Sequence, residues 1–393
     1  MARFRLLTLN NISAKGLARL PQEVFSHASD EAAPDAILVR SADMHGMDIP
    51  ASVLAVGRAG AGTNNIPIAS LSARGVPVFN TPGANANAVK ELVLAGMLLA
   101  VRNIVPALRF VDGLAETGDA LDRRVEDGKK HYAGIELAHR TLGIIGLGKI
   151  GSLVADMAIK LGMKVVGFDP EITVDAAWSL PSQVRRANSV EELLRLSDLV
   201  SLHVPQIPAT RHLMNRERLA LMKAHAVLLN FSREAIVDVD AVLEVLAARR
   251  LRGYVCDFPD ERLRGQASVL ALPHLGASTS EAEENCAVMV ADQIGEYLRH
   301  GNITNAVNFP GVVMPREAPF RVAIANANVP NMLGQISTVM AQAGLNIHNM
   351  LNKSRGEMAY TLVDVDSPVP DAVVDALRSI AGVLSVRYLP AEA

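Results

Sequence analysis

The chain has 393 residues, of which 50% are hydrophobic and 20% charged, and its 38 basic and 41 acidic side chains leave a net charge of −3. This length predicts two or three domains, and the composition excludes long disordered tracts. The near-neutral charge and an aromatic content of only 4% argue against a protein that binds nucleic acid through phosphates or stacked bases. No apolar run is long enough to cross a membrane, and two cysteines are too few for a disulfide framework, so we expect a cytoplasmic protein.

The first hundred residues alternate between short apolar strands and helical stretches. Strands are predicted at 36–39, 52–56 and 76–79, and the last is followed by the breaker sequence Asn80-Thr81-Pro82-Gly83. Apolar residues at helical spacing then predict a long helix over 86–105.

Beyond residue 140 the alternation becomes more regular. A helix is predicted over 149–161, and strands are predicted at 141–145, 164–168, 199–204, 226–231 and 253–258. Near-continuous apolar strands separated by helices are typical of a parallel sheet that is covered on both faces.

A different order follows a linker predicted at 305–317. Strands are predicted at 320–325, 346–353, 358–364 and 383–388, and helices at 330–343 and 370–380. This βαββαβ order predicts a ferredoxin-like module.

One glycine-rich loop indicates a cofactor. Gly146-Leu147-Gly148-Lys149-Ile150-Gly151 follows a predicted strand and opens a predicted helix. In that context Gly146 permits a tight turn, Gly148 lets the backbone approach a pyrophosphate, and Gly151 lets helix and strand pack closely. Asp169 ends the next strand, where a carboxylate accepts hydrogen bonds from the adenosine ribose and repels a 2′-phosphate. We therefore predict NAD rather than NADP; a glycine turn without a ligand is the alternative.

Three further motifs follow predicted strands, at 230–233, 257–261 and 273–279. Ligands bind at the carboxyl ends of parallel strands, so their side chains are expected to converge. Oxidation of an alcohol beside a carboxylate needs a cation for the carboxylate, which suits Arg233, and a base for the hydroxyl proton, which suits His274. Glu261 would hold the other ring nitrogen of that histidine. Taken singly, Arg233 also suits an ion pair, His274 a helix start and Glu261 a solvated charge in a loop.

Together these motifs resemble the D-isomer-specific 2-hydroxyacid dehydrogenases over nearly the whole chain. The resemblance also covers Arg58-Ala59-Gly60-Ala61-Gly62-Thr63-Asn64-Asn65-Ile66, Phe79-Asn80-Thr81-Pro82 and Ser201-Leu202-His203-Val204-Pro205. It implies an α/β fold in which a Rossmann-type NAD-binding domain, 99–276, is inserted into a flavodoxin-like substrate-binding domain, 1–98 and 277–310. It further implies an ACT regulatory domain at 319–393.

Such a tail is typical of the branch of the family that oxidises D-3-phosphoglycerate to 3-phosphohydroxypyruvate at the start of L-serine biosynthesis. The resemblance therefore implies this reaction, a small anionic substrate and a homodimer or homotetramer, with no metal. Another D-2-hydroxyacid dehydrogenase, such as a glyoxylate or hydroxypyruvate reductase, is the first alternative. A non-catalytic NAD-sensing scaffold, like the C-terminal-binding-protein corepressors, is the second.

The resemblance also implies roles for single residues. The amides of Ala59 and Gly60 would hold the substrate carboxylate beside Arg233, and Arg40 and Arg58 are candidates for the phosphate, although Arg40 alone also suits a structural ion pair. The remaining expected contacts are Asn80 and, from a neighbouring subunit, Lys130 for the substrate, and His203, Val204, Pro205, Asp257 and Gly276 for the cofactor.

In the tail, Asn326, Asn328 and Asn346 fall where the resemblance places residues that bind L-serine as an effector. A purely structural dimerisation module is the alternative. Two departures from the family pattern lie beside candidate site residues: Glu234 follows Arg233 where glycine is usual, and Arg262 follows Glu261 where proline is usual.

Overall fold

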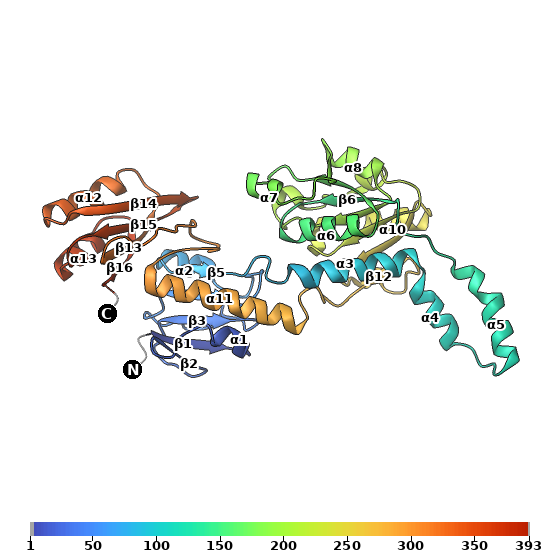
Figure 1. Ribbon diagram of the computed structural model, residues 1–393, viewed down its shortest axis with the longest axis horizontal. Coiled ribbons are helices and arrows are strands. Elements are labelled where there is room, and N and C mark those ends of the chain that lie inside the picture. The colour runs from blue at the N-terminus through green and yellow to red at the C-terminus, as the bar shows by residue number, and fades with distance from the viewer. Residues whose placement is uncertain (1–3, 392–393) are drawn as a thin grey trace. The chain divides into compact units, whose positions relative to one another are not determined.

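The computed structural model describes residues 4–391, apart from the side chain of residue 175. The chain divides into two compact units, Met1–Asn85 with Ser280–Ala393 and Ala86–Thr279, so the second is an insertion into the first (Figure 1). The insertion begins at Ala86 rather than near residue 99. The reason is that helix α3 (Ala86–Val101) buries Val89, Val93 and Met97 in the core of the second unit.

The first unit opens with a five-stranded parallel sheet in the order β2-β1-β3-β4-β5. This is the flavodoxin-like order that sequence analysis implies. Its elements are β1 (Phe4–Leu9), α1 (Ala14–Leu17), β2 (Phe25–Ala28), β3 (Ala36–Val39), β4 (Ala55–Arg58), α2 (Ile68–Ala73) and β5 (Val78–Phe79). The strand predicted at 52–56 begins later, at Ala55, because the amide of Val53 donates to the carbonyl of Pro50 in a turn (3.2 Å).

The long helix α11 (Ser280–His300) returns the chain to this sheet and covers one of its faces (Figure 1). Two glycines let α11 pack closely against its neighbours. A Cβ atom on Gly57 of β4 would lie 2.6 Å from Val290, and one on Gly16 would lie 2.5 Å from the main chain of Ala287. The other face of the sheet has its own apolar core, which includes Ile37, Val56 and Leu71. The first 85 residues therefore depend on a helix nearly 200 positions later.

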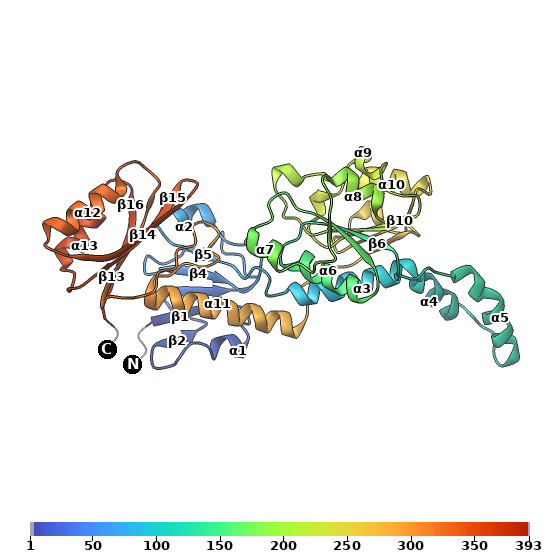
Figure 2. The same cartoon turned by 45° about the horizontal axis from the view of Figure 1, so that its top comes forward.

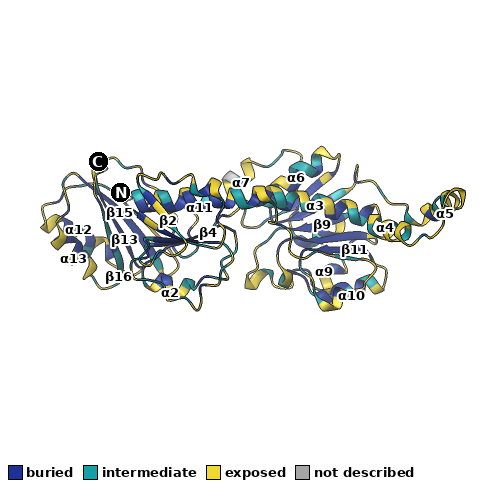
Figure 3. Ribbon diagram, turned by 90° about the horizontal axis from the view of Figure 1, so that it is seen from below, coloured by how far each residue is buried: buried dark blue, intermediate teal, exposed yellow. Residues whose placement is uncertain are grey.

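The C-terminal module of the first unit has the predicted βαββαβ order. Its elements are β13 (Phe320–Ala327), α12 (Met332–Gln342), β14 (Ile347–Arg355), β15 (Met358–Val365), α13 (Asp371–Arg378) and β16 (Val383–Leu389). The sheet is antiparallel with the order β14-β15-β13-β16, which is the ferredoxin-like arrangement. One face packs on α12 and α13, and the other packs on the core around α11, so β13 and β15 are buried along almost their whole length (Figure 3).

The module also caps the C-terminus of α11. Arg387 donates to the carbonyls of Tyr297 (3.1 Å) and Leu298 (2.8 Å), and Tyr360 donates to that of Gly301 (2.8 Å). Arg321, which is fully buried and paired with Asp364 (2.6 Å), donates to the carbonyl of His300 (3.0 Å). These donors satisfy carbonyls that a helix end leaves without partners, and the two cations oppose the negative end of the helix dipole.

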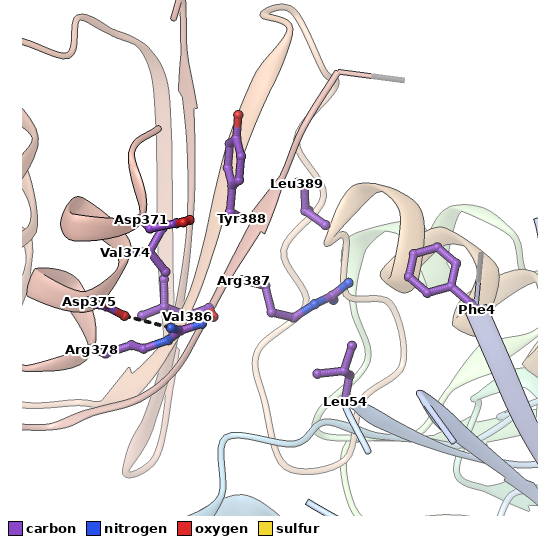
Figure 4. Close-up of a pocket in the computed structure, with 10 residues that line it drawn as sticks. All are labelled: Phe4, Leu54, Asp371, Val374, Asp375, Arg378, Val386, Arg387, Tyr388 and Leu389. Atoms are coloured by element: carbon purple, nitrogen blue, oxygen red, sulfur yellow. Dashed lines mark hydrogen bonds and ion pairs between the residues drawn. The ribbon is translucent and has the colours of Figure 1, made fainter. Parts of the chain in front are cut away.

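A cavity of about 580 Å³ opens where this module meets the first strand (Figure 4). Phe4 and Leu54 form one wall, and the side chains of α13 and β16 form the other, among them Arg378, which pairs with Asp375 (3.0 Å). None of the residues that line it is a candidate site residue from the sequence.

The second unit is built on a seven-stranded parallel sheet in the order β12-β11-β10-β9-β6-β7-β8. This is the Rossmann order, which confirms the predicted fold. Its strands are β6 (Thr141–Ile145), β7 (Lys164–Phe168), β8 (Arg185–Arg186), β9 (Leu199–Leu202), β10 (Ala226–Asn230), β11 (Leu251–Cys256) and β12 (Val269–Ala271).

Helices connect these strands and extend beyond the sheet. They are α3, α4 (Ile104–Asp112), α5 (Asp119–Lys129), η1 (Lys130–Tyr132), α6 (Lys149–Lys160), α7 (Val174–Trp178), α8 (Val190–Leu196), η2 (Pro208–Thr210), α9 (Arg216–Leu219), η3 (Glu234–Ile236), α10 (Val239–Ala247) and η4 (Glu261–Leu263). The helix predicted over 86–105 ends at Val101, where Arg252 donates to its last carbonyl (3.1 Å) and Asn103 turns into the left-handed region.

The helices α4 and α5 extend away from the sheet of the second unit (Figures 1 and 2). No residue of α4 is buried, and Ile104, Leu108 and Val111 expose apolar surface. Within residues 4–391 no single helix is long and apolar enough to cross a membrane, although α3 and α4 together pass that test across a 65° bend.

Candidate active site

Apart from Lys130, the candidate residues of the second unit lie after strands of its sheet, at the carboxyl edge. The Gly146 loop follows β6, Asp169 follows β7, His203 follows β9, Arg233 follows β10, Asp257 follows β11 and His274 follows β12. The strand order reverses between β6 and β9, which is the position where open α/β sheets bind ligands. The topology therefore puts the ends of these strands at one edge of the sheet, and the convergence of their side chains on one ligand stays a prediction.

The glycine loop has the geometry that a dinucleotide requires. Gly146 has a φ of +92°, and a Cβ atom there would lie 2.3 Å from the carbonyl oxygen of His203. A Cβ on Gly151 would lie 2.0 Å from the carbonyl oxygen of Gly146, so helix α6 approaches the loop closely. Around Gly148, in contrast, a Cβ would meet nothing within 4 Å. This open space lies at the N-terminus of α6, just before Lys149 and Ile150, where main-chain amides attract a pyrophosphate. The residues present fit NAD.

Asp169 is tied to that loop. Its Oδ2 accepts the amide of Leu147 (2.8 Å), and its Oδ1 accepts the amide of Glu171 (3.0 Å). These contacts fix the carboxylate at the end of β7 and leave it further lone pairs, because each carboxylate oxygen accepts two hydrogen bonds. The position suits the ribose contact expected from the sequence.

His203 is enclosed beneath the loop. Its Nε2 lies 2.8 Å from Ser201 Oγ, its amide donates to Ile145 (2.7 Å), and its Nδ1 is buried without a hydrogen-bond partner in the described part of the chain. Burial lowers the pKa of the His203 imidazole to about 4, so the ring is neutral near pH 7. Val204 packs below Gly146, whereas Pro205 is exposed and accepts a hydrogen bond from Thr210.

The turn that carries Arg233 is held by Asn230. This fully buried amide accepts the Ser232 N–H (3.1 Å) and donates to the carbonyl of Arg233 (2.9 Å). Ser232 Oγ in turn donates to the carbonyl of Leu202 at the end of β9 (2.5 Å). The main chain of Arg233 is thereby fixed, while its side chain is exposed at the sheet edge, bonded only to the Ser232 carbonyl (2.6 Å) among the described residues.

Asp257 fixes the loop that carries His274. Its Oδ1 accepts the amide of Leu275 (2.7 Å) and its Oδ2 accepts the amide of Gly276 (2.8 Å), and the residue is 1% exposed. His274 itself has a φ of +58°, and its exposed ring packs against Phe258 with 5.1 Å between centroids. In the structure Asp257 and Gly276 bind each other next to His274, and the cofactor contact expected of these two residues stays a prediction.

Glu261 begins η4, which Asp260 caps. Arg262 binds Asp260 through its amide (2.8 Å), Nε (3.0 Å) and Nη2 (2.6 Å), and these hydrogen bonds lower the pKa of the Asp260 carboxyl to about 2. A further contact joins Arg262 to Asp240 of α10 (2.8 Å). The arginine that stands where proline is usual thus ties down the turn on which Glu261 is exposed.

The predicted Glu261–His274 pair is not formed. Over residues 4–391 no hydrogen bond or ion pair joins the two side chains, both of which are exposed. An exposed carboxylate gains little from an imidazole in water, and catalytic hydrogen bonds are often long in ligand-free structures.

In the first unit, Arg58 and its neighbours form a polar loop. Arg58 Nε donates to Asn65 Oδ1 (2.9 Å), and Asn65 Nδ2 donates to the carbonyl of Ala42 (2.7 Å). Asn80 donates to the carbonyl of Ala61 (2.6 Å). Asn65 thus joins the loops that follow β3 and β4.

The expectation that the amides of Ala59 and Gly60 hold a carboxylate does not fit this loop. The Ala59 amide donates to Val39 (2.8 Å) in the extension of the sheet, and the Gly60 amide donates to Arg58 (2.9 Å). Both donors are therefore engaged within the chain.

Arg40 follows β3 and forms an ion pair with Glu283 of α11, with 2.5 Å between Nη2 and Oε1. The sequence leaves Arg40 open to a structural ion pair, and the structure contains one. Lys130 lies in the second unit, at the exposed end of α5, next to Lys129, which pairs with Glu126.

The three effector candidates do not gather in one chain. Asn326 is buried and its Oδ1 lacks a partner in the described chain, and Asn328 nearby donates to Gly356 (3.0 Å). Asn346 bonds Asp366 (2.8 Å). The register places Ala327 opposite Met358 and Ile347 opposite Val365, so Asn346 lies at the other end of β15.

Sequence reasoning missed the residues that position the others. Asn230 and Asn65 lie inside motifs that are recognisable in the sequence. A polar side chain next to an apolar strand in such a motif is a signal for a residue that fixes the following turn. Glu283 has no such signal, because its partner lies 243 positions away.

Comparison with known proteins places the chain among dehydrogenases. Residues 94–277 match the family described as D-isomer specific 2-hydroxyacid dehydrogenase, NAD binding domain. The chain is 34% identical over 349 residues to D-3-phosphoglycerate dehydrogenase of Haemophilus influenzae, covering 86% of this chain and 81% of that one. It is 32% identical over 350 residues to the enzyme of the same name from Escherichia coli K12, with coverages of 86% and 82%. The NAD⁺-bound 3-phosphoglycerate dehydrogenase of Entamoeba histolytica shares the fold, with a TM-score of 0.57 and 23% identity over 78% of this chain and 99% of that one.

Proposed function

Since this chain belongs to the D-isomer specific 2-hydroxyacid dehydrogenase family, we propose that it oxidises D-3-phosphoglycerate to 3-phosphohydroxypyruvate with NAD. The relatives named for this reaction are matched over more than four-fifths of their length. The observation that carries the chemistry is the group of side chains at the carboxyl edge of the Rossmann sheet, where Arg233 and His274 each stand on a turn fixed by a buried polar residue.

Each side chain has one part in this proposal. The guanidinium of Arg233 binds the substrate carboxylate, because its planar fork matches the two oxygens. A ring nitrogen of His274 takes the hydroxyl proton as the alcohol at carbon 2 becomes a ketone. Glu261 stabilises the imidazolium that this transfer creates. NAD, when bound, accepts the hydride that leaves carbon 2.

The cofactor contacts in the proposal follow the geometry of the loop. The amides at the start of α6, around Gly148, receive the pyrophosphate, and Asp169 receives the ribose hydroxyls. His203 and Val204 form part of the adenine side of the site. Arg58, which is oriented by Asn65, is a binding group for the substrate phosphate.

The proposal includes a homo-oligomer. The exposed apolar side chains of α4 suit a contact with a second copy of the chain. Lys130, at the end of the neighbouring helix α5, is a candidate to reach the substrate bound by that copy. L-serine is the proposed effector of the C-terminal module. Because Asn328 and Asn346 lie at opposite ends of β15, a serine site that uses both asparagines takes them from two copies. Cys256 and Cys286 are buried free thiols, which suits the reducing cytoplasm.

The test is a substrate panel. NADH formation is measured at 340 nm with D-3-phosphoglycerate and with unphosphorylated D-2-hydroxyacids, and NADH consumption with the matching 2-oxoacids, each with and without L-serine. We expect the highest kcat/KM with the phosphorylated pair. A preference for glycerate or glycolate over phosphoglycerate would assign the chain to another branch of the family, and the absence of turnover with every compound would support an NAD-sensing scaffold.

A further inference from the structure

The ion pair between Arg40 and Glu283 places a carboxylate on a residue that is a candidate for binding the substrate phosphate. The two atoms are 2.5 Å apart, and the side chains are 36% and 41% exposed, so both groups are accessible to a ligand. Arg40 is the residue after β3, and Glu283 lies in the first turn of α11.

The charges around this pair form one cluster. Burial raises the pKa of the Cys286 thiol, and that thiol also experiences the positive charges of Arg40 and Arg58 and the negative charge of Glu283. The charges of Arg40, Arg58 and Glu283 therefore all act on this one thiol of α11. Without the carboxylate, this cluster is a cationic surface that suits a phosphate, for which guanidinium groups are the preferred ligands.

Helix α11 gives Glu283 a fixed backbone. The glycines at positions 16 and 57 bring the helix against its neighbours, and Arg387 and Arg321 cap its C-terminus. The pair therefore opens by rotation of the Glu283 or the Arg40 side chain, both of which are partly exposed, without a movement of the helix.

We propose that Glu283 is a specificity-determining residue, a carboxylate of the chain itself that competes with the substrate phosphate for Arg40. The proposal rests on the proposed function and adds to it the residue that sets how strongly the phosphate is preferred. Substrate binding exchanges one anion for another on the same guanidinium, so the net gain from the phosphate is reduced by the ion pair that it displaces. Substrates without a phosphate do not make this exchange.

Replacement of Glu283 by glutamine tests this exchange. E283Q keeps the shape of the side chain and removes its charge, so the KM for D-3-phosphoglycerate is expected to fall by on the order of 3- to 10-fold at low salt. We expect kcat, and the KM for an unphosphorylated D-2-hydroxyacid, to remain within twofold of the wild type. The difference between the variants is expected to shrink in high salt, which screens an exposed interaction.

E284Q is the matched control. Glu284 lies on the next position of the same helix and pairs with Lys15 (2.6 Å), so this variant removes the same charge from a similar surface ion pair. Its KM for the phosphorylated substrate is expected to stay within twofold of the wild type, and melting temperatures of both variants report any structural effect.

The outcomes distinguish a failure of the proposed function from a failure of the role proposed for Glu283. If the wild type turns over unphosphorylated substrates only, the proposed function is overturned, and this inference with it. If D-3-phosphoglycerate is a substrate but E283Q leaves its KM unchanged or raises it, the proposed function stands and this inference is overturned. A fall in KM of equal size in E284Q also overturns this inference, because removal of any negative charge from this helix would then have the same effect.

Discussion

Asp257 is the residue whose replacement tests most directly how the active-site edge is held together. Its two carboxylate oxygens accept the amides of Leu275 and Gly276 in a place that is 1% exposed. In D257N one oxygen becomes an NH₂ group, so one of these main-chain amides faces a donor and loses its acceptor. A charge-assisted hydrogen bond of this kind contributes about 1.5–3 kcal/mol, so we expect the second unit to lose about 2 kcal/mol of unfolding free energy.

The loss also reaches the chemistry, because His274 immediately precedes the two amides. Misplacement of a catalytic group by about 1 Å costs on the order of 10²-fold in rate, so we expect kcat/KM to fall by about 10- to 100-fold in D257N. Urea unfolding followed by circular dichroism measures the first effect, and NADH formation at saturating NAD measures the second.

Asp238→Asn is the control. Asp238 caps α10 by accepting the amide of Ala241 (3.1 Å), and asparagine caps helices as well as aspartate does, so the same change there is expected to cost less than about 0.5 kcal/mol. If D257N unfolds at the same urea concentration as D238N and keeps wild-type kcat/KM, the contacts of Asp257 do not hold the His274 loop, and this account of the site is refuted.

Three further results are expected. His274→Ala is expected to lower kcat by at least on the order of 10²-fold while the binding of NADH, followed by its fluorescence, is unchanged; near-normal turnover would remove the proton-transfer role. Gly148→Val adds a side chain to open space and is expected to weaken NAD binding without lowering the melting temperature, whereas Gly151→Ala, with its Cβ 2.0 Å from a carbonyl oxygen, is expected to destabilise the fold; the opposite pattern would contradict the loop geometry. The pKa of His203 is about 4 in the folded chain and about 6.5 in an unfolded one, so the unfolded state binds more protons between these values. This contribution to stability is therefore complete above pH 6.5 and falls by about 3 kcal/mol toward pH 4, and His203→Asn is expected to flatten that dependence in urea titrations at each pH.

The sequence predicts the parts of this molecule that have a local cause. The apolar runs at Ala36–Val39, Thr141–Ile145 and Lys164–Phe168 coincide with observed strands, and the Gly146 loop has the turn and the open position that its spacing implies. Such features depend on residues that are close in the chain, and pattern reasoning detects them.

The contacts that the sequence did not predict connect distant residues. The Arg40–Glu283 pair spans 243 positions, and the capping of α11 by Arg387 spans about ninety. The amides of Ala59 and Gly60 look available in the sequence, yet the first continues the sheet and the second closes a tight turn on Arg58. Nothing in a local pattern states which of several polar partners a donor takes, because that choice is made by tertiary packing.

The capping of α11 by residues near the end of the chain delays folding of the first unit during synthesis. The sheet of residues 4–79 is complete early in synthesis, but one of its faces is covered by α11, and α11 is terminated by residues as late as Arg387. At ordinary translation rates the ribosome takes roughly 15–60 s to move from residue 85 to the end of β16. Until α11 has been synthesised, an apolar face of the first sheet stays open to water, and we expect the inserted Rossmann unit, whose strands all lie within residues 86–279, to fold by itself in the meantime. We therefore expect the nascent chain, rather than the finished protein, to be the form of this molecule that most needs a chaperone.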